Sequence, residues 1–261
     1  MSSKGDSSEG RIISVASGKG GTGKTITTLN LAMELHKLGK DVTIVDADLE
    51  DPNLGINLGL YSPQSTINES LEKDRSLVEA VHIHETGMRL IPASLSINYI
   101  NTSLRSIDKA FKKLGGYIIV DCGPGLSENV VSCIDQSDSV IAVTNPMRSA
   151  VSGAVRLTEM VKDLDKTVEG IVVNNLTSKE ISPKEISSIT GCDVLGEVPY
   201  DINIDRSIVN KKPLVHHKPY SKASFAYRKI AHDIVDEEFK PKAKHHIRRY
   251  VDSLLSSLMA R

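Results

Sequence analysis

The chain has 261 residues, which is enough for one α/β domain with a sizeable core or for two small domains at most. Its formal net charge of −1 favours neither nucleic acid nor membrane, and 4% aromatic residues without tryptophan argue against a base-stacking platform. Three widely spaced cysteines form no paired metal-ligand motif, which suits reduced core residues, and no apolar run is long enough to span a membrane.

A P-loop motif follows a polar stretch over residues 1–10, which we expect to be a disordered tail. Residues 18–25 read GKGGTGKT, the G-x-x-x-x-G-K-T pattern, with an apolar run over 12–16 before it and a predicted helix over 25–38 after it. Glycines permit backbone turns that point N–H groups at phosphates, and the helix N-terminus completes the anion cradle. A chance glycine-rich turn is the alternative, but all four features favour the P-loop.

The motif assigns roles within this loop. Lys24 would reach the β- and γ-phosphates as a catalytic group, and the Thr25 hydroxyl would bind Mg²⁺. The residues expected to contact the nucleotide are Gly18, Lys19, Gly20, Gly21, Thr22, Gly23, Lys24, Thr25 and Ile26.

Apolar runs alternate with helical patterns along most of the chain, which predicts βαβ units. We therefore expect an α/β fold of three layers, with a doubly wound and mainly parallel sheet. Further strands are predicted over 41–45, 88–92, 117–120, 139–144, 169–174 and 194–198. Further helices are predicted over 66–71, 76–81, 103–114, 126–136, 149–164 and 221–237.

Carboxylates follow two of these strands. Asp46 and Asp48 come directly after the strand over 41–45, and Asp121 ends the β-branched run YIIV. Side chains at the carboxyl ends of parallel strands face the ligand crevice, so we expect Asp46 and Asp121 at Mg²⁺ and Asp48 beside the attacking water. A solvated acidic turn is the alternative for residues 46–53. The turn over 122–125 is expected to be flexible, with Cys122 as a packing residue.

Two other polar groups are ambiguous. His82 and His84 beside Glu85 could bind a metal, although a solvated turn is the favoured interpretation. Asn174 and Asn175 end a predicted strand, where an amide can offer a donor and an acceptor to adenine; an Asn-rich turn is the alternative.

The second lysine of the loop, Lys19, is not needed for a P-loop. The form GKGGTGKT resembles the deviant Walker A motif of the MinD/ParA ATPases, VTIVDADLEDPNLG resembles their switch I, and VTNPMRSAVSGA resembles the MinD branch. The resemblance covers residues 11–237 and implies a P-loop NTPase fold of the SIMIBI type with ATP and Mg²⁺ as cofactors.

The same resemblance implies residue roles. Lys19 would act in trans across an ATP-sandwiched dimer, Asp48 would be the hydrolytic aspartate, and one of the two asparagines would contact adenine. Further implied residues are Asn53, Gly123 and Gly125 in the switches, and Pro199, Tyr200 and Asp201 in the loop whose backbone contacts the base. Two departures stand out: Ile26 replaces a hydroxyl residue that touches the α-phosphate, and Pro124 comes one residue later than usual.

Residues 238–261 form a basic linker and an amphipathic helical pattern. Its apolar face consists of Ile247, Tyr250, Val251, Leu254, Leu255, Leu258 and Met259. This helix could pack on the domain, lie on an anionic membrane, or bind a protein partner or another copy; a MinD-like chain would use it as a reversible membrane anchor.

The leading functional hypothesis is a MinD-like ATPase that hydrolyses ATP to ADP and phosphate. Its ATP-dependent homodimer would act as a spatial switch, for the cell division site or for a surface structure, with a protein activator. It would be cytoplasmic and reversibly peripheral to the inner face of the cell membrane. A ParA-type partition ATPase that binds DNA nonspecifically is the alternative, and metallocofactor assembly would need paired cysteines that the chain lacks.

Overall fold

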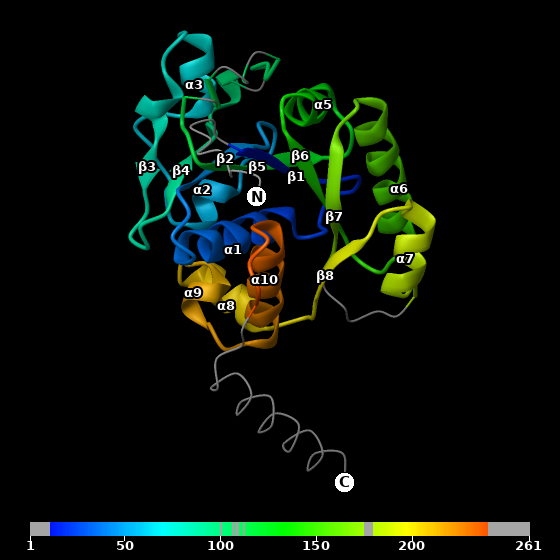
Figure 1. The fold of residues 1–261 in the computed structure, drawn as a ribbon. Coiled ribbons are helices and arrows are strands. Elements are labelled where there is room, and N and C mark those ends of the chain that lie inside the picture. The colour runs from blue at the N-terminus through cyan, green and yellow to red at the C-terminus, as the bar shows by residue number, and fades with distance from the viewer. Residues whose placement is uncertain are drawn as a thin grey trace, which may run out of the picture.

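The computed structural model describes residues 11–99, 101–105, 107, 110–111, 113–174 and 180–239. Its centre is an eight-stranded sheet in the order β3-β4-β2-β5-β1-β6-β7-β8 (Figure 1). Within the described ranges the strand pairs are parallel, apart from the antiparallel pair of β3 with β4. The strands are β1 (Arg11–Ser17), β2 (Val42–Ala47), β3 (His82–Ile83), β4 (Arg89–Ile91), β5 (Tyr117–Pro124), β6 (Ser139–Thr144), β7 (Thr167–Asn174) and β8 (Val194–Val198).

Helices cover both faces of this sheet, which confirms the predicted three-layer, doubly wound α/β fold (Figure 1). A hydrophobic core lies on each face of the sheet, and alternate residues of β1 point into one or the other. Ile12 packs on the side of α5 and α6, and Ile13 on the side of α1 and α10. The helices are α1 (Lys24–Lys37), α2 (Leu54–Asn57), α3 (Ile67–Glu72), η1 (Leu77–Ala80), η2 (Ile97–Tyr99), α5 (Glu128–Asp135), α6 (Arg148–Asp163), α7 (Pro183–Thr190), α8 (Asn203–Val209), α9 (Leu214–His217) and α10 (Lys222–Ile234).

A buried ion pair fastens α10 to α1. Glu34 is 2% exposed and accepts hydrogen bonds from Arg228 Nε at 3.0 Å and Nη2 at 3.3 Å. Lys37 Nζ lies 3.0 Å from the same carboxylate and also donates to the Val215 carbonyl at 2.6 Å. A buried carboxylate is tolerated only with such partners, so these contacts fix α10 on α1, the helix that follows the P-loop.

Several local predictions need correction. Residues 103–105 are not helical, although 110–111 are, and β5 continues through Cys122 to Pro124 where a flexible turn was expected. The pair His82–Ile83 is an edge strand, with His82 Nε2 at 2.9 Å from the Ser65 carbonyl oxygen. The predicted solvated turn is therefore confined to residues 84–87, where Glu85 is exposed and the Gly87 N–H donates to the His84 carbonyl oxygen at 2.8 Å. Among the described residues, no three or more His, Cys, Asp or Glu side chains gather into a group that could hold a metal ion.

The predictions for the two ends of the chain, the tail over 1–10 and the apolar face over 247–259, lie outside the described residues. Within the described part, none of the helices has the length and apolar character needed to cross a membrane.

Candidate nucleotide-binding site

The P-loop connects β1 to α1 at the carboxyl edge of the sheet. Gly21 and Gly23 have φ values of 76° and 91°, in the left-handed region that glycine adopts without strain. Gly23 is also the N-cap of α1, and neither a capping side chain nor an acidic residue occupies the first turn. The N-terminal N–H groups of α1 are therefore left for an anion, beside the buried side chain of Lys24.

Two close contacts fix the position of this loop. A Cβ at Gly18 would lie 2.0 Å from the carbonyl oxygen of Gly153 in α6, so only glycine lets these two backbones touch. Asn174 Nδ2, at the end of β7, donates a hydrogen bond to the Thr22 carbonyl oxygen over 3.0 Å. A Cβ at Gly23 would lie 2.1 Å from the same nitrogen. The loop thus contacts the first turns of α6 on one side and the end of β7 on the other.

The Asn174 contact bears on the predicted adenine site. Its side chain is buried, and the amide nitrogen supports the phosphate loop. Its contact with adenine remains a prediction, and Asn175 lies outside the described residues.

Two buried carboxylates lie beside the loop on neighbouring strands. Asp46 of β2 and Asp121 of β5 are register partners, and each is 1% exposed. Burial raises the pKa of Asp121 to about 6, although hydrogen bonds from Thr25 and Thr28 oppose that shift. Burial, followed by the charge of Asp121, raises the pKa of Asp46 well above its ordinary value. Lys24 is a neighbouring positive charge that also opposes the shift at Asp121. Two apposed buried carboxylates, with the Thr25 hydroxyl beside one of them, fit Mg²⁺.

Asp48 belongs to the first predicted switch and lies against the second. Its pKa is raised by burial, while the backbone N–H of Asp51 and the charge of Lys24 oppose the shift. The Asp51 N–H donates to Asp48 Oδ1 over 3.2 Å, and a Cβ at Gly123 would lie 3.4 Å from that oxygen. The structure therefore brings Asp48 together with Gly123, one residue from each predicted switch.

The other predicted switch residues are held by backbone contacts. Asn53 Nδ2 donates to the Asp51 carbonyl oxygen at 2.7 Å, and the next N–H, of Leu54, donates to Asp46 Oδ2 at 3.2 Å. Gly125 has a φ of 79°, and its N–H donates to the Ser17 carbonyl oxygen at 3.0 Å. The first segment is thus tied to β2, and the second to the end of β1, which leads into the P-loop.

Lys19 points along the molecule's own surface. Its Nζ lies 2.7 Å from Ser149 Oγ in the first turn of α6, in an exposed hydrogen bond. Within one chain this lysine contacts α6; its role in trans remains a prediction.

The predicted base loop follows β8, next to Asn174, since Val198 and Asn174 are register partners. The Asp201 carboxylate accepts hydrogen bonds from the N–H of Asn203 at 2.9 Å and from its side chain at 2.6 Å. This carboxylate therefore contacts α8, and the backbone contact of Pro199 and Tyr200 with the base remains a prediction.

Ile26 packs against the apolar core that α1 shares with α10. Apolar packing thus occupies the position where the resemblance places a hydroxyl residue.

Sequence reasoning missed Thr28 and Gly153. Thr28 Oγ1 donates to Asp121 Oδ1 over 3.1 Å from the second turn of α1. The resembling stretch VTNPMRSAVSGA contained Gly153, but nothing local indicated its contact with Gly18.

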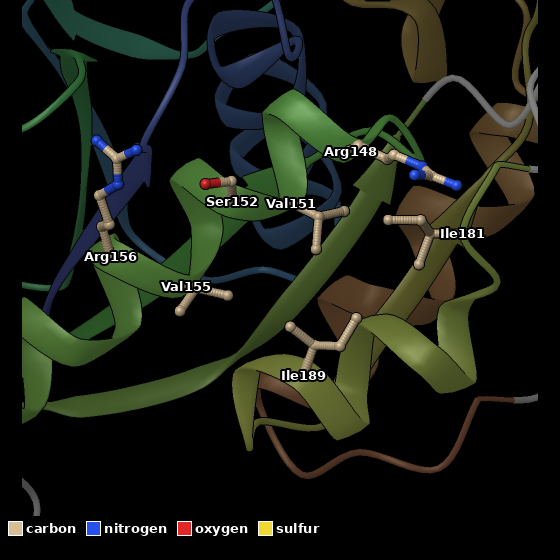
Figure 2. A pocket seen from close by; sticks show the side chains of 7 residues that line it. All are labelled: Arg148, Val151, Ser152, Val155, Arg156, Ile181 and Ile189. Atoms are coloured by element: carbon tan, nitrogen blue, oxygen red, sulfur yellow. The ribbon is translucent and has the colours of Figure 1, made fainter.

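A groove opens on the outer side of α6, against α7. It has a volume of about 430 Å³ and is lined by Arg148, Val151, Ser152, Val155, Arg156, Ile181 and Ile189. Figure 2 shows valines of α6 pointing toward Ile189 of α7, with an arginine at each end of the groove. Helix α6 thus contacts Gly18 and Lys19 of the P-loop on one face and lines this groove with another.

The fold, the glycine loop and the paired carboxylates define the chain as a P-loop nucleotide-binding protein. The family model described as ParA, NUBPL iron-transfer P-loop NTPase, matches residues 9–235. The chain belongs to this MinD/ParA family of P-loop NTPases, whose site takes a nucleotide and Mg²⁺.

The family includes characterised and uncharacterised relatives. An uncharacterised ATP-binding protein of Methanocaldococcus jannaschii is 31% identical over 95% of this chain and 97% of its own. The septum site-determining protein MinD of Synechocystis is 32% identical over 85% of this chain and 88% of its own.

Solved structures of MinD share the fold. MinD of Pyrococcus horikoshii, complexed with Mg-ADP, has a TM-score of 0.81 and 29% identity, and the match covers 86% of this chain and 95% of that one. The MinC:MinD complex of Aquifex aeolicus matches with a TM-score of 0.78 and 25% identity, over 89% of this chain and 98% of that one.

Proposed function

We propose that this chain is an ATPase that hydrolyses ATP to ADP and phosphate, and that ATP joins two copies into a spatial-positioning switch. The observation that carries the proposal is the contact of Lys19 with Ser149. The second lysine of the loop is exposed and reaches α6, outside the cradle that Lys24 and the helix N-terminus form. That position supports a lysine available to another copy.

The groups for hydrolysis come from this chain's own strand ends. Lys24 and the loop N–H groups would bind the phosphates, and the Gly125 N–H would exchange the Ser17 carbonyl for the γ-phosphate. Asp48 would orient the attacking water; its raised pKa makes it a better proton acceptor than a solvated aspartate. Mg²⁺ held by Thr25 with Asp46 and Asp121 would neutralise phosphate charge.

The groove between α6 and α7 is the surface that we propose for a regulatory protein. Its valines and Ile189 offer an apolar floor, and its two arginines favour an acidic partner. Because α6 also contacts Gly18 and Lys19, a partner in the groove can act on the loop through one helix. The MinC:MinD complex supports a protein partner for this family.

Membrane association is proposed from the sequence of residues 247–259 alone. A single amphipathic helix binds an anionic bilayer weakly, whereas an ATP dimer carrying two gains avidity. The chain would then be cytoplasmic and reversibly peripheral to the inner face of the cell membrane, positioning a division site or a surface structure. Nonspecific DNA binding by a ParA-type dimer is the alternative, and its affinity would fall steeply with salt.

Hydrolysis and location are tested separately. Phosphate release from ATP should be lost in D48A while ADP binding is kept, and unchanged hydrolysis in D48A would contradict the role of Asp48. For location, the full chain and a chain ending at Phe239 are sedimented with anionic liposomes in ATP or ADP. We expect ATP-dependent binding of the full chain only; equal behaviour of both chains in both nucleotides would contradict the membrane switch.

A further inference from the structure

We infer that Thr28 is a positioning residue for Mg²⁺-dependent nucleotide binding, because its hydroxyl holds the Asp121 carboxylate from within α1. The inference uses only the family's nucleotide and metal chemistry and is independent of dimerisation, membranes or hydrolysis.

The Thr28 contact runs across the structure. Its side chain is fully buried, and Oγ1 donates to Asp121 Oδ1 over 3.1 Å, 93 residues away in sequence. The hydroxyl of a threonine inside a helix commonly donates a hydrogen bond to a carbonyl oxygen of the preceding turn. Here the hydroxyl donates to a carboxylate of β5 instead, and a hydrogen bond to a charged group is stronger than one to a neutral group.

Thr28 complements Thr25. The two residues are three positions apart on α1, so they share one face of the helix, and both hydrogen-bond Asp121. The Thr25 oxygen has to serve the metal ion as well, so its contact with Asp121 must adapt when the ion binds. Thr28 is not a predicted metal ligand, so its hydroxyl can hold Asp121 both with and without the bound ion.

The neighbouring carboxylate makes this hold necessary. Asp46 is the register partner of Asp121, and two buried negative charges repel each other. Without an ion between them, this repulsion is relieved when a carboxylate takes up a proton or when Asp121 rotates away. The Thr28 hydroxyl opposes that rotation, so the pair is kept ready for the cation.

The chain offers a matched control. Thr27 is equally buried but lies on the α10 side of α1, beside Tyr227. Thr27→Val therefore removes the same atoms from the same helix without touching Asp121. Thr28→Ser keeps the hydroxyl of Thr28 and removes only its methyl group.

The test is binding of a fluorescent ADP analogue during a Mg²⁺ titration, with EDTA as the metal-free baseline. Thr28→Val should raise the Mg²⁺ concentration at half-saturation about 3- to 10-fold, the effect of one hydrogen bond, with unchanged affinity in EDTA. Thr28→Ser should restore the wild-type value, and Thr27→Val should stay within about twofold of it.

Three results would overturn the inference: an unchanged Mg²⁺ requirement in Thr28→Val, an equal loss of affinity in EDTA, or the same shift in Thr27→Val. If Thr28→Val does not fold, Thr28→Ala is titrated in its place, with the same expected shift and the same contradicting results.

Discussion

Asn174 Nδ2 lies 3.0 Å from the carbonyl oxygen of Thr22 and donates a hydrogen bond to it, which joins the end of β7 to the P-loop. The strand expected to read the base therefore also supports the loop that holds the phosphates. Together with the predicted adenine contact of Asn174, this bond would couple the base end and the phosphate end of the site through one side chain.

Replacing Asn174 should weaken nucleotide binding whichever base is present. Asn174→Ala leaves the Thr22 carbonyl without this donor, and we expect ADP affinity to fall about 3- to 10-fold. Calorimetry with ADP and GDP is the measurement, and the exposed Asn98→Ala is the control. Equal losses for both nucleotides support a role in the loop. A loss for ADP alone would contradict it and favour adenine recognition.

A side chain at Gly153 should damage the P-loop from a neighbouring helix. The Cβ of Gly153→Ala would lie 2.9 Å from backbone atoms of Gly18, so the loop or α6 has to shift. Overpacking of this kind costs about 1–3 kcal/mol. We expect a lower denaturation midpoint and weaker ADP binding, whereas the exposed Glu159→Ala on the same helix should match the wild type. Wild-type ADP affinity in Gly153→Ala would refute the contact.

The Asp121 carboxyl should make the nucleotide-free protein less stable as the pH rises. Its folded pKa of about 6 exceeds the ordinary 3.8, so the folded state holds the proton more tightly. Stability is then lost between about pH 4 and 6, and the penalty is complete above pH 6, at about 3 kcal/mol or less.

Denaturation in EDTA can measure this penalty. At pH 8, Asp121→Asn should be more stable than the wild type, and the difference should shrink as the pH falls toward 4. Addition of Mg²⁺ with ADP should reverse the order, since the wild-type carboxylate then has a cation partner. The exposed Asp135→Asn should show neither effect. A pH-independent difference for Asp121→Asn would contradict the assignment.

Removal of Arg228 should loosen α10. Arg228→Met leaves Glu34 buried with Lys37 as its remaining described cation. Breaking a buried pair costs about 3–5 kcal/mol, and we expect about 2–3 kcal/mol because Lys37 stays. Urea denaturation is the measurement. A double variant with Glu34→Leu should recover most of the loss, and no recovery would show that the pair is not its cause.

The sequence predicted the features that local patterns encode. The glycines of the P-loop and the carboxylates Asp46 and Asp121 were found because turn chemistry and strand ends are read over a few residues. Helix α7 also had a local signal that went unread: Pro183 at its first position, and a capping box of Ser182 with Glu185. This capping box is a local signal for the start of α7, just as the P-loop is a local signal for the start of α1.

The missed residues depend on contacts between distant segments. Thr28 looked like one of several polar residues in a helix, and Gly153 like a small residue in another. Their roles arise only when β5 lies beside α1 and α6 beside the loop. The edge strand His82–Ile83 was missed for a related reason, because two residues carry no period and pairing with β4 defines them.

The central claim is that ATP joins two copies through Lys19, and the mass of the protein in solution tests it most directly. Light scattering is measured for Asp48→Ala, which should keep its ATP, and for the double variant that also carries Lys19→Ala. We expect a dimer for Asp48→Ala in ATP, a monomer in ADP, and a monomer that still binds ATP for the double variant. As a control, the double variant of Asp48→Ala with Lys184→Ala, at an exposed lysine, should remain a dimer in ATP. A monomer for Asp48→Ala in ATP, or a dimer that survives Lys19→Ala, would contradict the account.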